Sequence, residues 1–458
     1  MLLNAMCMFT LSGMSNYLFK VLPSMSKQMM LVASMLMSMP TLYSWNELGV
    51  YYTTDGMADT LMLLTLYLLP MSMLSNWNNI NSNLYYELVL YTGLMMLMNF
   101  MCQDMTTFYM FFEASLAPLF MLIGIYGASN KDKAADYMLM YTLLSSLFML
   151  LAMALYQYLL GSTDYQTTGL VVLSMDLQCM LFLAMSMGMA VKTPLVPVHT
   201  WLPVVHSESP LAGSILLAGM LLKLAIYGII RLMMPTLSDA TMLFTPMMYV
   251  MAMMTMMYTS MMTLRQTDLK VIVAYSSMSH MAVAMLGMFS NNLIGLNGSL
   301  MLSMAHGFVS PGLFILLGGS LYSRYHNRLI YYYQGLMSYM PMFSFYFMFL
   351  SFCNMGAPLS VNFMGELLSM SGAIMRSPIL GSMAAISVTL SASYQLKLTN
   401  RLTGGVKMPS MKLTADLIYR EQVILLLLII PTVIFGMWPS YMSSMTEWDL
   451  SKLLYLFI

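Results

Sequence analysis

Two lysines lie inside strongly apolar parts of the sequence, where a charged side chain is costly. Lys192 ends one apolar segment and Lys223 lies near the middle of the next, within residues 188–231. A charged side chain at membrane depth costs about 2.5 to 3.5 kcal/mol on insertion scales, so each lysine is a candidate functional group. His199 and His206 fall in the connection between the two segments. Lysine and histidine both bind and release protons, so this spacing predicts a proton path.

Glu113 is a third candidate, because apolar residues flank it on both sides and no polar loop is near. A buried carboxylate needs a partner, and we expect Lys192 to supply it. Burial alone favours the neutral forms of both groups, whereas their mutual attraction favours the charged forms. A change in a neighbouring charge would therefore shift the proton affinity of the lysine. The alternative is a static ion pair that only joins two helices.

Two further histidines and a second glutamate extend this set. His280 and His306 lie in apolar segments, and Gly307 and Pro311 follow His306, which predicts a distorted helix that admits water. A neutral histidine donates and accepts hydrogen bonds and titrates near pH 6.5, so both residues suit a proton relay toward Glu366. The alternative for each histidine is a simple hydrogen bond between helices.

The remaining charges are interpreted individually. Lys223 has no acidic residue within one helical turn, so we expect it to exchange its proton readily rather than to extend toward the interface. Glu208 neighbours His206 and opens a helix, whose positive end favours a carboxylate, so its role is either proton uptake or helix capping. Charges in short polar connections are interpreted as interfacial anchors, namely Arg265, Asp268, Lys270, Arg324, His326 and Arg328.

The composition indicates which elements must position these residues. The 458 residues are 59% hydrophobic and 8% charged, whereas a soluble domain carries about 25% charged residues. Apolar runs of about 20 residues recur along the chain, which predicts about fourteen membrane-spanning helices. The predicted spans are two within residues 1–45, then about 57–74, 85–102, 105–126, 134–159, 171–196, 210–233, 240–263, 269–289, 296–321, 336–374, 379–398 and 417–438. The predicted fold is thus an all-α polytopic membrane protein.

Two of these spans are interrupted at matching places in the two halves of the chain. Pro194 and Pro197 break one span just after Lys192, and Gly356 and Pro358 break another just before Glu366. Paired interruptions of this kind indicate an inverted-repeat transporter with its site near mid-membrane. The alternative is that these prolines only kink the helices.

Charge and cysteine content exclude several other functions. The formal net charge is +0, with 18 basic and 18 acidic residues, so the sequence gives no reason to expect a nucleic-acid partner. The cysteines stand singly, without the spacing of a metal or iron–sulfur site, so we expect redox chemistry to occur elsewhere; they are Cys7, Cys102, Cys179 and Cys353. The N-terminal sequence lacks the features of a cleaved signal or transit peptide, so a mitochondrial location would imply synthesis inside the organelle.

Four long motifs in one order identify a family resemblance. They are KTPLVPVHTWLPVVHSESPLAGSILLAGMLLKLAIYGIIR, LRQTDLKVIVAYSSMSHMA, MAHGFVSPGLF and GAPLSVNFMGELL. Over roughly residues 57–438 the chain resembles the antiporter-like membrane-arm subunits of mitochondrial NADH:ubiquinone oxidoreductase (complex I), which are similar to the large subunits of multisubunit sodium/proton antiporters. The resemblance implies fourteen helices, two inverted five-helix repeats and broken helices 7 and 12. The implied units are 1–80, 81–235 (helices 4–8), 236–400 (helices 9–13) and 401–458.

The resemblance also implies residue roles. The family's helix-five glutamate, broken-helix lysine and central lysine fall on Glu113, Lys192 and Lys223. Its relay histidines fall on His280 and His306, and its exit-side charge falls on Glu366, where glutamate favours the chain 4 branch of the family. His199, His206 and Glu208 remain candidates for proton uptake or relay.

The expected function is proton translocation driven by electron transfer in other subunits. No cofactor is expected in this chain, and the family implies that flavin, iron–sulfur clusters and ubiquinone bind elsewhere in the complex. Expected partners are neighbouring antiporter-like subunits and lipids, with cardiolipin as the candidate, in the mitochondrial inner membrane. The alternatives are a subunit of a multisubunit cation/proton antiporter and a structural membrane scaffold.

Overall fold

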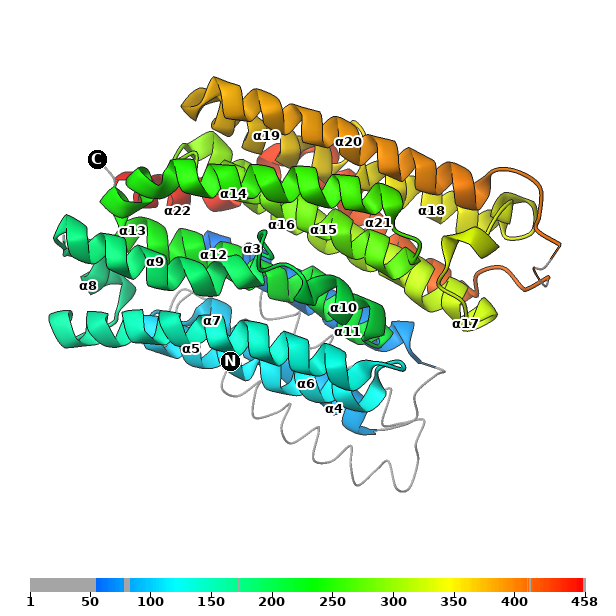
Figure 1. The fold of residues 1–458 in the computed structure, drawn as a ribbon, viewed down its shortest axis with the longest axis horizontal. Coiled ribbons are helices and arrows are strands. Elements are labelled where there is room, and N and C mark those ends of the chain that lie inside the picture. Colours follow the sequence, from blue (N-terminus) through cyan, green and yellow to red (C-terminus); the bar gives the residue numbers. More distant parts are fainter. Residues whose placement is uncertain (1–54, 78–82, 172, 410, 412, 456–458) are drawn as a thin grey trace.

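The computed structural model describes residues 55–77, 83–171, 173–409, 411 and 413–455. This part of the chain is a bundle of long helices, drawn side by side in Figure 1, and contains no β-strand. Eleven of its helices are long and apolar enough to cross a membrane. The two spans predicted within residues 1–45 lie outside the described residues.

The first half of the described chain contains helices α3 to α13. Their bounds are α3 Gly56–Ser75, α4 Asn83–Met101, α5 Met105–Ala114, α6 Leu116–Tyr126, α7 Lys131–Leu160, α8 Tyr165–Leu170, α9 Met175–Lys192, α10 Trp201–Glu208, α11 Leu211–Leu216, α12 Leu222–Gly228 and α13 Met234–Thr236. Helices α5 and α6 form one crossing, and α11 to α13 form another. These bounds confirm the predicted spans of this half to within a few residues.

The second half contains helices α14 to α22. Their bounds are α14 Ser238–Arg265, α15 Leu269–Met288, α16 Leu293–Phe314, α17 Tyr322–Tyr325, α18 Pro341–Asn354, α19 Val361–Arg376, α20 Pro378–Thr403, α21 Tyr419–Met437 and α22 Pro439–Tyr455. In Figure 1 the helices run between two ends of the bundle. We call these the α17 end, which includes the end of α10 and the start of α15, and the α13 end.

Both predicted interruptions are present. The helix α9 ends at Lys192 and α10 begins at Trp201, while α18 ends at Asn354 and α19 begins at Val361. The crossing α9–α10 runs toward the α17 end, and α18–α19 runs toward the α13 end, so the two broken crossings point in opposite directions (Figure 1). This is the arrangement expected of inverted repeats.

A third interrupted crossing was not predicted. Near the α17 end, Glu421 of α21 pairs with Arg324 at 2.8 Å, and near the α13 end the Thr446 hydroxyl of α22 donates to Asn297 at 3.1 Å. Helices α21 and α22 therefore follow the whole length of the crossing formed by α16 and α17. A Cβ at Gly436 would lie 2.1 Å from the Leu359 carbonyl, so this crossing touches the α18–α19 interruption.

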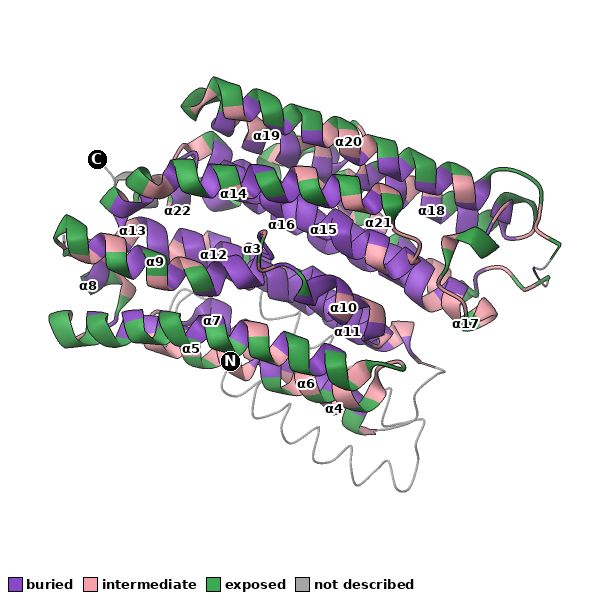
Figure 2. Cartoon of the chain, in the orientation of Figure 1, coloured by how far each residue is buried: buried purple, intermediate pink, exposed green. Residues whose placement is uncertain are grey.

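The most buried crossings occupy the centre of the bundle (Figure 2). The membrane-length window of residues 293–325 is 100% buried and that of residues 211–236 is 94% buried, whereas those of α7 and α20 are 39% and 33% buried. Lys223 and His306 lie on the two central crossings. Polar side chains there are shielded from lipid by protein on all sides, which is where intramembrane ionisable groups are tolerated.

The central crossings contain π-helical turns. Gly307 and Pro311 predicted a distorted helix after His306, but the sequence did not indicate the turns on the Lys223 crossing. One turn covers Leu217–Leu221, directly before Lys223, and another covers Ile229–Met233 on the same crossing. A third covers Ile315–Leu321, after His306 and Pro311. Such turns change the hydrogen-bond register of the backbone and are frequent at functional sites.

Candidate proton-transfer site

Lys223 forms the centre of the site. Its side chain is fully buried, and its Nζ donates a hydrogen bond to the Ala218 carbonyl at 2.5 Å. That carbonyl belongs to the π-helical turn just before the lysine. The Nζ also lies 2.9 Å from Nδ1 of His306. The lysine has no carboxylate partner among the described residues, so an imidazole and a carbonyl hold its head group.

Two histidines continue the polar contacts from Lys223. The rings of His306 and His280 have centroids 5.9 Å apart, and both side chains are almost fully buried. The Nε2 atoms of both rings have no hydrogen-bond partner among the described residues. Ser310 donates to the His306 carbonyl at 2.7 Å, which keeps a hydroxyl beside that ring. Each imidazole thus retains a nitrogen free to accept or donate a proton.

Glu366 is the next group in this series. Its Oε1 lies 3.0 Å from Nδ1 of His280, at ion-pair distance although the angle is poor for a hydrogen bond. A Cβ at Gly356 would lie 2.7 Å from its Oε2, so the carboxylate rests against the α18–α19 interruption. Gly356 has φ +78°, a conformation that glycine adopts without strain. The interruption therefore both positions the carboxylate and leaves room for it.

Lys192 and Glu113 do not form the predicted direct ion pair. Among the described residues the two have no N–O contact within 4.0 Å. The Lys192 Nζ instead donates to the Phe112 carbonyl at 3.0 Å and lies over the Phe112 ring, 2.8 Å from its centroid. The Glu113 carboxylate remains close enough to act on the ammonium electrostatically, and its Oε1 is buried without a partner. A carbonyl and a ring face thus hold the ammonium where the sequence predicted a carboxylate.

The two histidines of the first interruption occupy different surroundings. His206 is fully buried and stacks on Phe314 of α16 at 4.7 Å between centroids, and neither ring nitrogen has a described partner. The charges of Lys270 and Lys223 both act on it, so both lysines lie near this ring. His199 packs edge-on against Tyr258 of α14 at 5.2 Å, away from Lys223. The structure therefore brings His206, but not His199, to the central groups.

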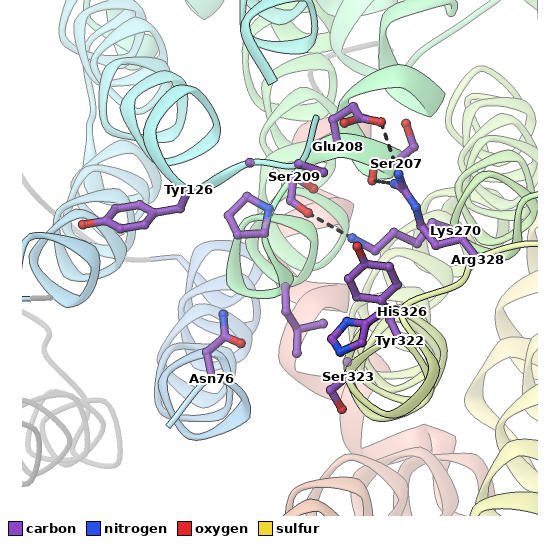
Figure 3. A pocket seen from close by; sticks show the side chains of 16 residues that line it. Asn76, Tyr126, Ser207, Glu208, Ser209, Lys270, Tyr322, Ser323, His326 and Arg328 are labelled. Carbon is purple, nitrogen blue, oxygen red and sulfur yellow. Dashed lines mark hydrogen bonds and ion pairs between the residues drawn. The ribbon is translucent and has the colours of Figure 1, made fainter. Parts of the chain in front are cut away.

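A cavity of about 370 Å³ lies at the α17 end of the bundle, lined by Ser207, Glu208 and Ser209, which directly follow His206 in the chain (Figure 3). Lys270 enters it from α15, and its Nζ donates to the Ser209 carbonyl at 3.0 Å. Glu208 and Arg328 face one another there, with 3.5 Å between Oε1 and Nη2. Ser209 and Ser214 share a hydrogen bond of 2.8 Å, which carries hydroxyl groups from the cavity into the start of α11.

The interpretation of Lys270 as an interfacial anchor is wrong. Its side chain is only 6% exposed, because it lies under the segment from Ser207 to Ser209 and under Arg328. A lysine in the first turn of a helix is ordinarily solvated, and nothing in the local sequence distinguishes this one. Only the packing of α10 against α15 places it on the polar cavity.

Comparison with known proteins gives the family. The family model described as NADH:quinone oxidoreductase/Mrp antiporter, TM, matches residues 102–391. The chain belongs to this family. It is 68% identical to NADH-ubiquinone oxidoreductase chain 4 of Debaryomyces hansenii over 98% of this chain and 96% of that protein. It is 63% identical to the chain 4 protein of Candida albicans, again over 98% of this chain and 96% of the relative.

Solved structures of the family share the fold. A chain of respiratory complex I from Thermus thermophilus with bound NADH superposes with a TM-score of 0.87 at 26% identity, covering 98% of this chain and 99% of that one. A chain of the Mrp complex from Dietzia sp. gives 0.85 at 16% identity, covering 99% and 97%. The match to the family confirms the all-helical membrane fold with its two broken helices.

The family fold brings together four of the predicted site residues in sequence-distant pairs. Lys223 and His306 are 83 positions apart, yet are in contact. His280 and Glu366 are likewise joined across α15 and α19. Lys192 makes no hydrogen bond with Lys223 among the described residues. It lies over the ring of Phe112 on α5, and Phe108 connects that ring to Tyr227 of α12 through centroid distances of 5.5 and 6.2 Å. The site thus has a connected central part and a separate Lys192–Glu113 part.

Proposed function

We propose that this chain is a proton-translocating membrane-arm subunit of mitochondrial complex I, a part of the NADH:ubiquinone reductase that pumps protons. The observation that carries the proposal is a buried series of four titratable groups. Lys223 lies 2.9 Å from His306, the His306 and His280 rings have centroids 5.9 Å apart, and His280 lies 3.0 Å from Glu366. Such groups are expensive at membrane depth and mark proton relays.

The geometry supports a stepwise transfer that moves one proton from Lys223 to Glu366. The Lys223 ammonium gives a proton to Nδ1 of His306, so one N–H bond breaks and another forms. The imidazolium of His306 then releases a proton toward the ring of His280. His280 passes a proton to the Glu366 carboxylate, whose Oε1 lies 3.0 Å from its Nδ1. Lys223 is left neutral and ready for another proton.

Uptake would occur from the α17 end. The cavity beside Glu208 and Lys270 would supply an aqueous mouth. His206 is two residues before Glu208 on α10 and near both Lys270 and Lys223, so it would carry protons inward from that mouth. The free ring nitrogens of His206 suit it for exchanging protons with both lysines. His199 lies apart from this route, so we assign uptake to His206 and Glu208 rather than to His199.

The driving input would arrive at Glu113. This residue is partly buried on α5, and its charge acts on Lys192 without a direct contact. Moving one charge against 100 mV costs about 2.3 kcal/mol. A change of about two pKa units at a single relay group supplies that amount, at 1.36 kcal/mol per unit. Electron transfer to ubiquinone, with its flavin and iron–sulfur clusters, would take place in other subunits.

The assignment to complex I also implies a membrane location and partner subunits. We place the chain in the mitochondrial inner membrane, beside other antiporter-like subunits and in contact with lipids such as cardiolipin. We further propose that residues 81–235 and 236–400 form two inverted repeats. Their opposed broken crossings, α9–α10 and α18–α19, support this division.

Replacing the central lysine tests the function. In complex I carrying Lys223→Met, proton uptake by sealed vesicles per NADH oxidised should fall, while NADH oxidation with an artificial electron acceptor stays normal. The matched control is Lys397→Met, because Lys397 is exposed on α20 and donates only to the Leu264 carbonyl. Unchanged pumping by an assembled Lys223→Met complex would rule out the proposal.

Two other functions make different predictions. A subunit of a multisubunit cation/proton antiporter would let a sodium gradient drive pH changes without NADH, and the family description also names an antiporter. A scaffold would lose assembly, but not proton flux per assembled complex, when Glu113 is replaced by Gln. The buried and connected side chains of Lys223 and His306 favour proton translocation over both.

A further inference from the structure

A tyrosine hydroxyl lies beside the last group of the relay. Tyr394 of α20 is 2% exposed, and the Glu366 charge acts on its hydroxyl, which also lies next to the hydroxyls of Ser276 and Ser279 on α15. Its oxygen has no well-directed hydrogen bond among the described residues. Buried tyrosine hydroxyls ordinarily have a partner, so this one remains free to exchange a proton with the polar groups beside it.

The buried face of α20 continues from that tyrosine toward the α13 end. Ser391 and Ser387 lie three and seven residues before Tyr394, on the same side of the helix, and both are buried. Their hydroxyls donate to the Val388 and Ala384 carbonyls, which leaves their oxygens free to accept. Two-thirds of the membrane-length window of α20 is not buried, so Ser387 and Ser391 belong to the smaller, buried face of this helix.

A second orphaned tyrosine hydroxyl lies on the neighbouring helix. Tyr249 of α14 is 2% exposed, and its hydroxyl has no hydrogen-bond partner in the part of the chain that the structure describes. α14 packs against α20. At 1.5 Å per residue, Tyr249 lies about 16 Å and Ser387 about 14 Å from the starts of their helices at the α13 end. The two residues are therefore at similar depth.

The tyrosine on α14 is also linked to the end of the bundle. The charge of Arg376, the last residue of α19, acts on Tyr249. Arg376 is exposed, and its Nη2 lies 3.8 Å from the Met242 sulfur. Asn291, in the turn between α15 and α16, contacts the same sulfur at 2.9 Å. Polar groups are thus present between Tyr249 and the exposed α13 end, where Arg376 and Asn291 meet at the Met242 sulfur.

We propose that protons leave Glu366 through the hydroxyl groups of Tyr394, Ser391, Ser387 and Tyr249, and emerge beside Arg376 at the α13 end. This proposal rests on the proposed function and adds the release half of the route. The uptake cavity lies at the opposite end, so a proton that follows both halves crosses the whole bundle.

Each hydroxyl in this route accepts one proton and releases another, so its own protonation state is the same before and after the transfer. Protonated Glu366 gives its proton to the Tyr394 oxygen as that hydroxyl passes its own proton onward. The carboxylate is regenerated, and the phenol ends with one O–H bond as before. A hydroxyl can do this because it donates and accepts at the same atom. Phenylalanine has the same ring and cannot.

The test removes single hydroxyls from assembled complex I and measures proton yield. In sealed vesicles, Tyr394→Phe and Tyr249→Phe should lower protons translocated per NADH oxidised roughly twofold or more, because a relay atom is lost. Electron transfer with an uncoupler should stay normal. The matched control is Tyr156→Phe, which removes another buried, unpartnered hydroxyl from α7, far from Glu366. Equal proton yields for Tyr394→Phe, Tyr249→Phe and the control would overturn the proposal.

A second pair of variants separates relay from packing. Ser387→Ala should lower the proton yield, whereas Ser382→Ala should not, since Ser382 makes the same type of bond to its own helix but faces outward. Lys223→Met separates this proposal from the proposed function. Lost pumping in Lys223→Met with normal pumping in both tyrosine variants refutes only the release route. Normal pumping in Lys223→Met refutes the function itself.

Discussion

Lys223 of α12 and His306 of α16 are in direct contact, with 2.9 Å between Nζ and Nδ1. The lysine also donates to the Ala218 carbonyl, which the preceding π-helical turn presents to it. A buried ammonium held by a neutral imidazole has a proton acceptor already in place. This differs from a lysine held by a carboxylate, where the ion pair itself opposes transfer.

The contact between Lys223 and His306 predicts the effect of removing the imidazole. His306→Gln keeps a polar side chain of similar length but cannot take up a proton at physiological pH. We expect pumping per NADH to be largely lost, with assembly retained. His199→Gln is the control, because His199 packs against Tyr258 of α14 and lies apart from the route. Native gels report assembly and vesicle acidification reports pumping; a pumping His306→Gln complex would show that the imidazole is only a packing group.

The close approach of Gly356 to Glu366 makes a second prediction. Gly356→Ala would place a Cβ 2.7 Å from Oε2 and strain a backbone at φ +78°. The backbone strain alone is worth about 1 to 2 kcal/mol. Gly161→Ala is a matched control, because Gly161 has φ +71° and nothing within 4 Å of the added atom.

Both glycine variants should lower the thermal stability of the complex, but only Gly356→Ala should also lower the proton yield. Melting followed by native gels measures the first effect, and vesicle acidification measures the second. Equal proton yields in the two variants would mean that the interruption does not position the carboxylate.

Lys270 gives a third prediction, because its side chain lines the uptake cavity. Lys270→Gln removes the charge that acts on His206 and weakens the bond to the Ser209 carbonyl. We expect slower proton uptake at limiting proton concentration, so the variant should lose more activity at alkaline than at acidic pH. Arg265→Gln, at the exposed end of α14, should have no such effect. If the pH profile of pumping is identical for both variants, Lys270 has no role in proton uptake.

A pair of carboxyl groups at the α13 end gives a fourth prediction, on pH. Asp104 and Asp164 lie opposite one another in a short bridge between two connections outside the membrane-spanning helices. Burial, and then the hydrogen bond and charge of Asp164, raise the pKa of Asp104 to about 6. The native state therefore binds this proton more tightly than the unfolded chain. The stabilisation is complete below about pH 4 and is lost as the pH rises through about 6.

Hydrogen exchange measures this effect directly. The bridge amides of Met105 and Tyr165 donate to the Thr163 and Gln103 carbonyls, both at 3.0 Å. Relative to their intrinsic rates, these amides should exchange faster above pH 6 than below it. Asp104→Asn should remove the difference, whereas Asp176→Asn at the start of α9 should leave it. Protection that is independent of pH in the unmodified chain would contradict the prediction.

Much of the fold was predictable because the membrane constrains it strongly. Apolar runs long enough to cross the bilayer must be helical, since lipid offers no partner for the backbone. The interruptions after Lys192 and before Glu366 were also visible, because proline and glycine act locally. The α21–α22 crossing was predicted only as far as residue 438, since Glu447, Asp449 and Lys452 lower the hydropathy of its second half.

The sequence by itself determined which side chains are titratable and embedded in apolar segments, since that follows from residue type and local composition. The tertiary structure decided which of them touch. It joined Lys223 to His306 and His280 to Glu366, placed Phe112 rather than Glu113 against Lys192, and buried Lys270. These pairings depend on the rotation and crossing of helices far apart in the chain. A single sequence carries no local signal for them, because they result from packing over the whole bundle.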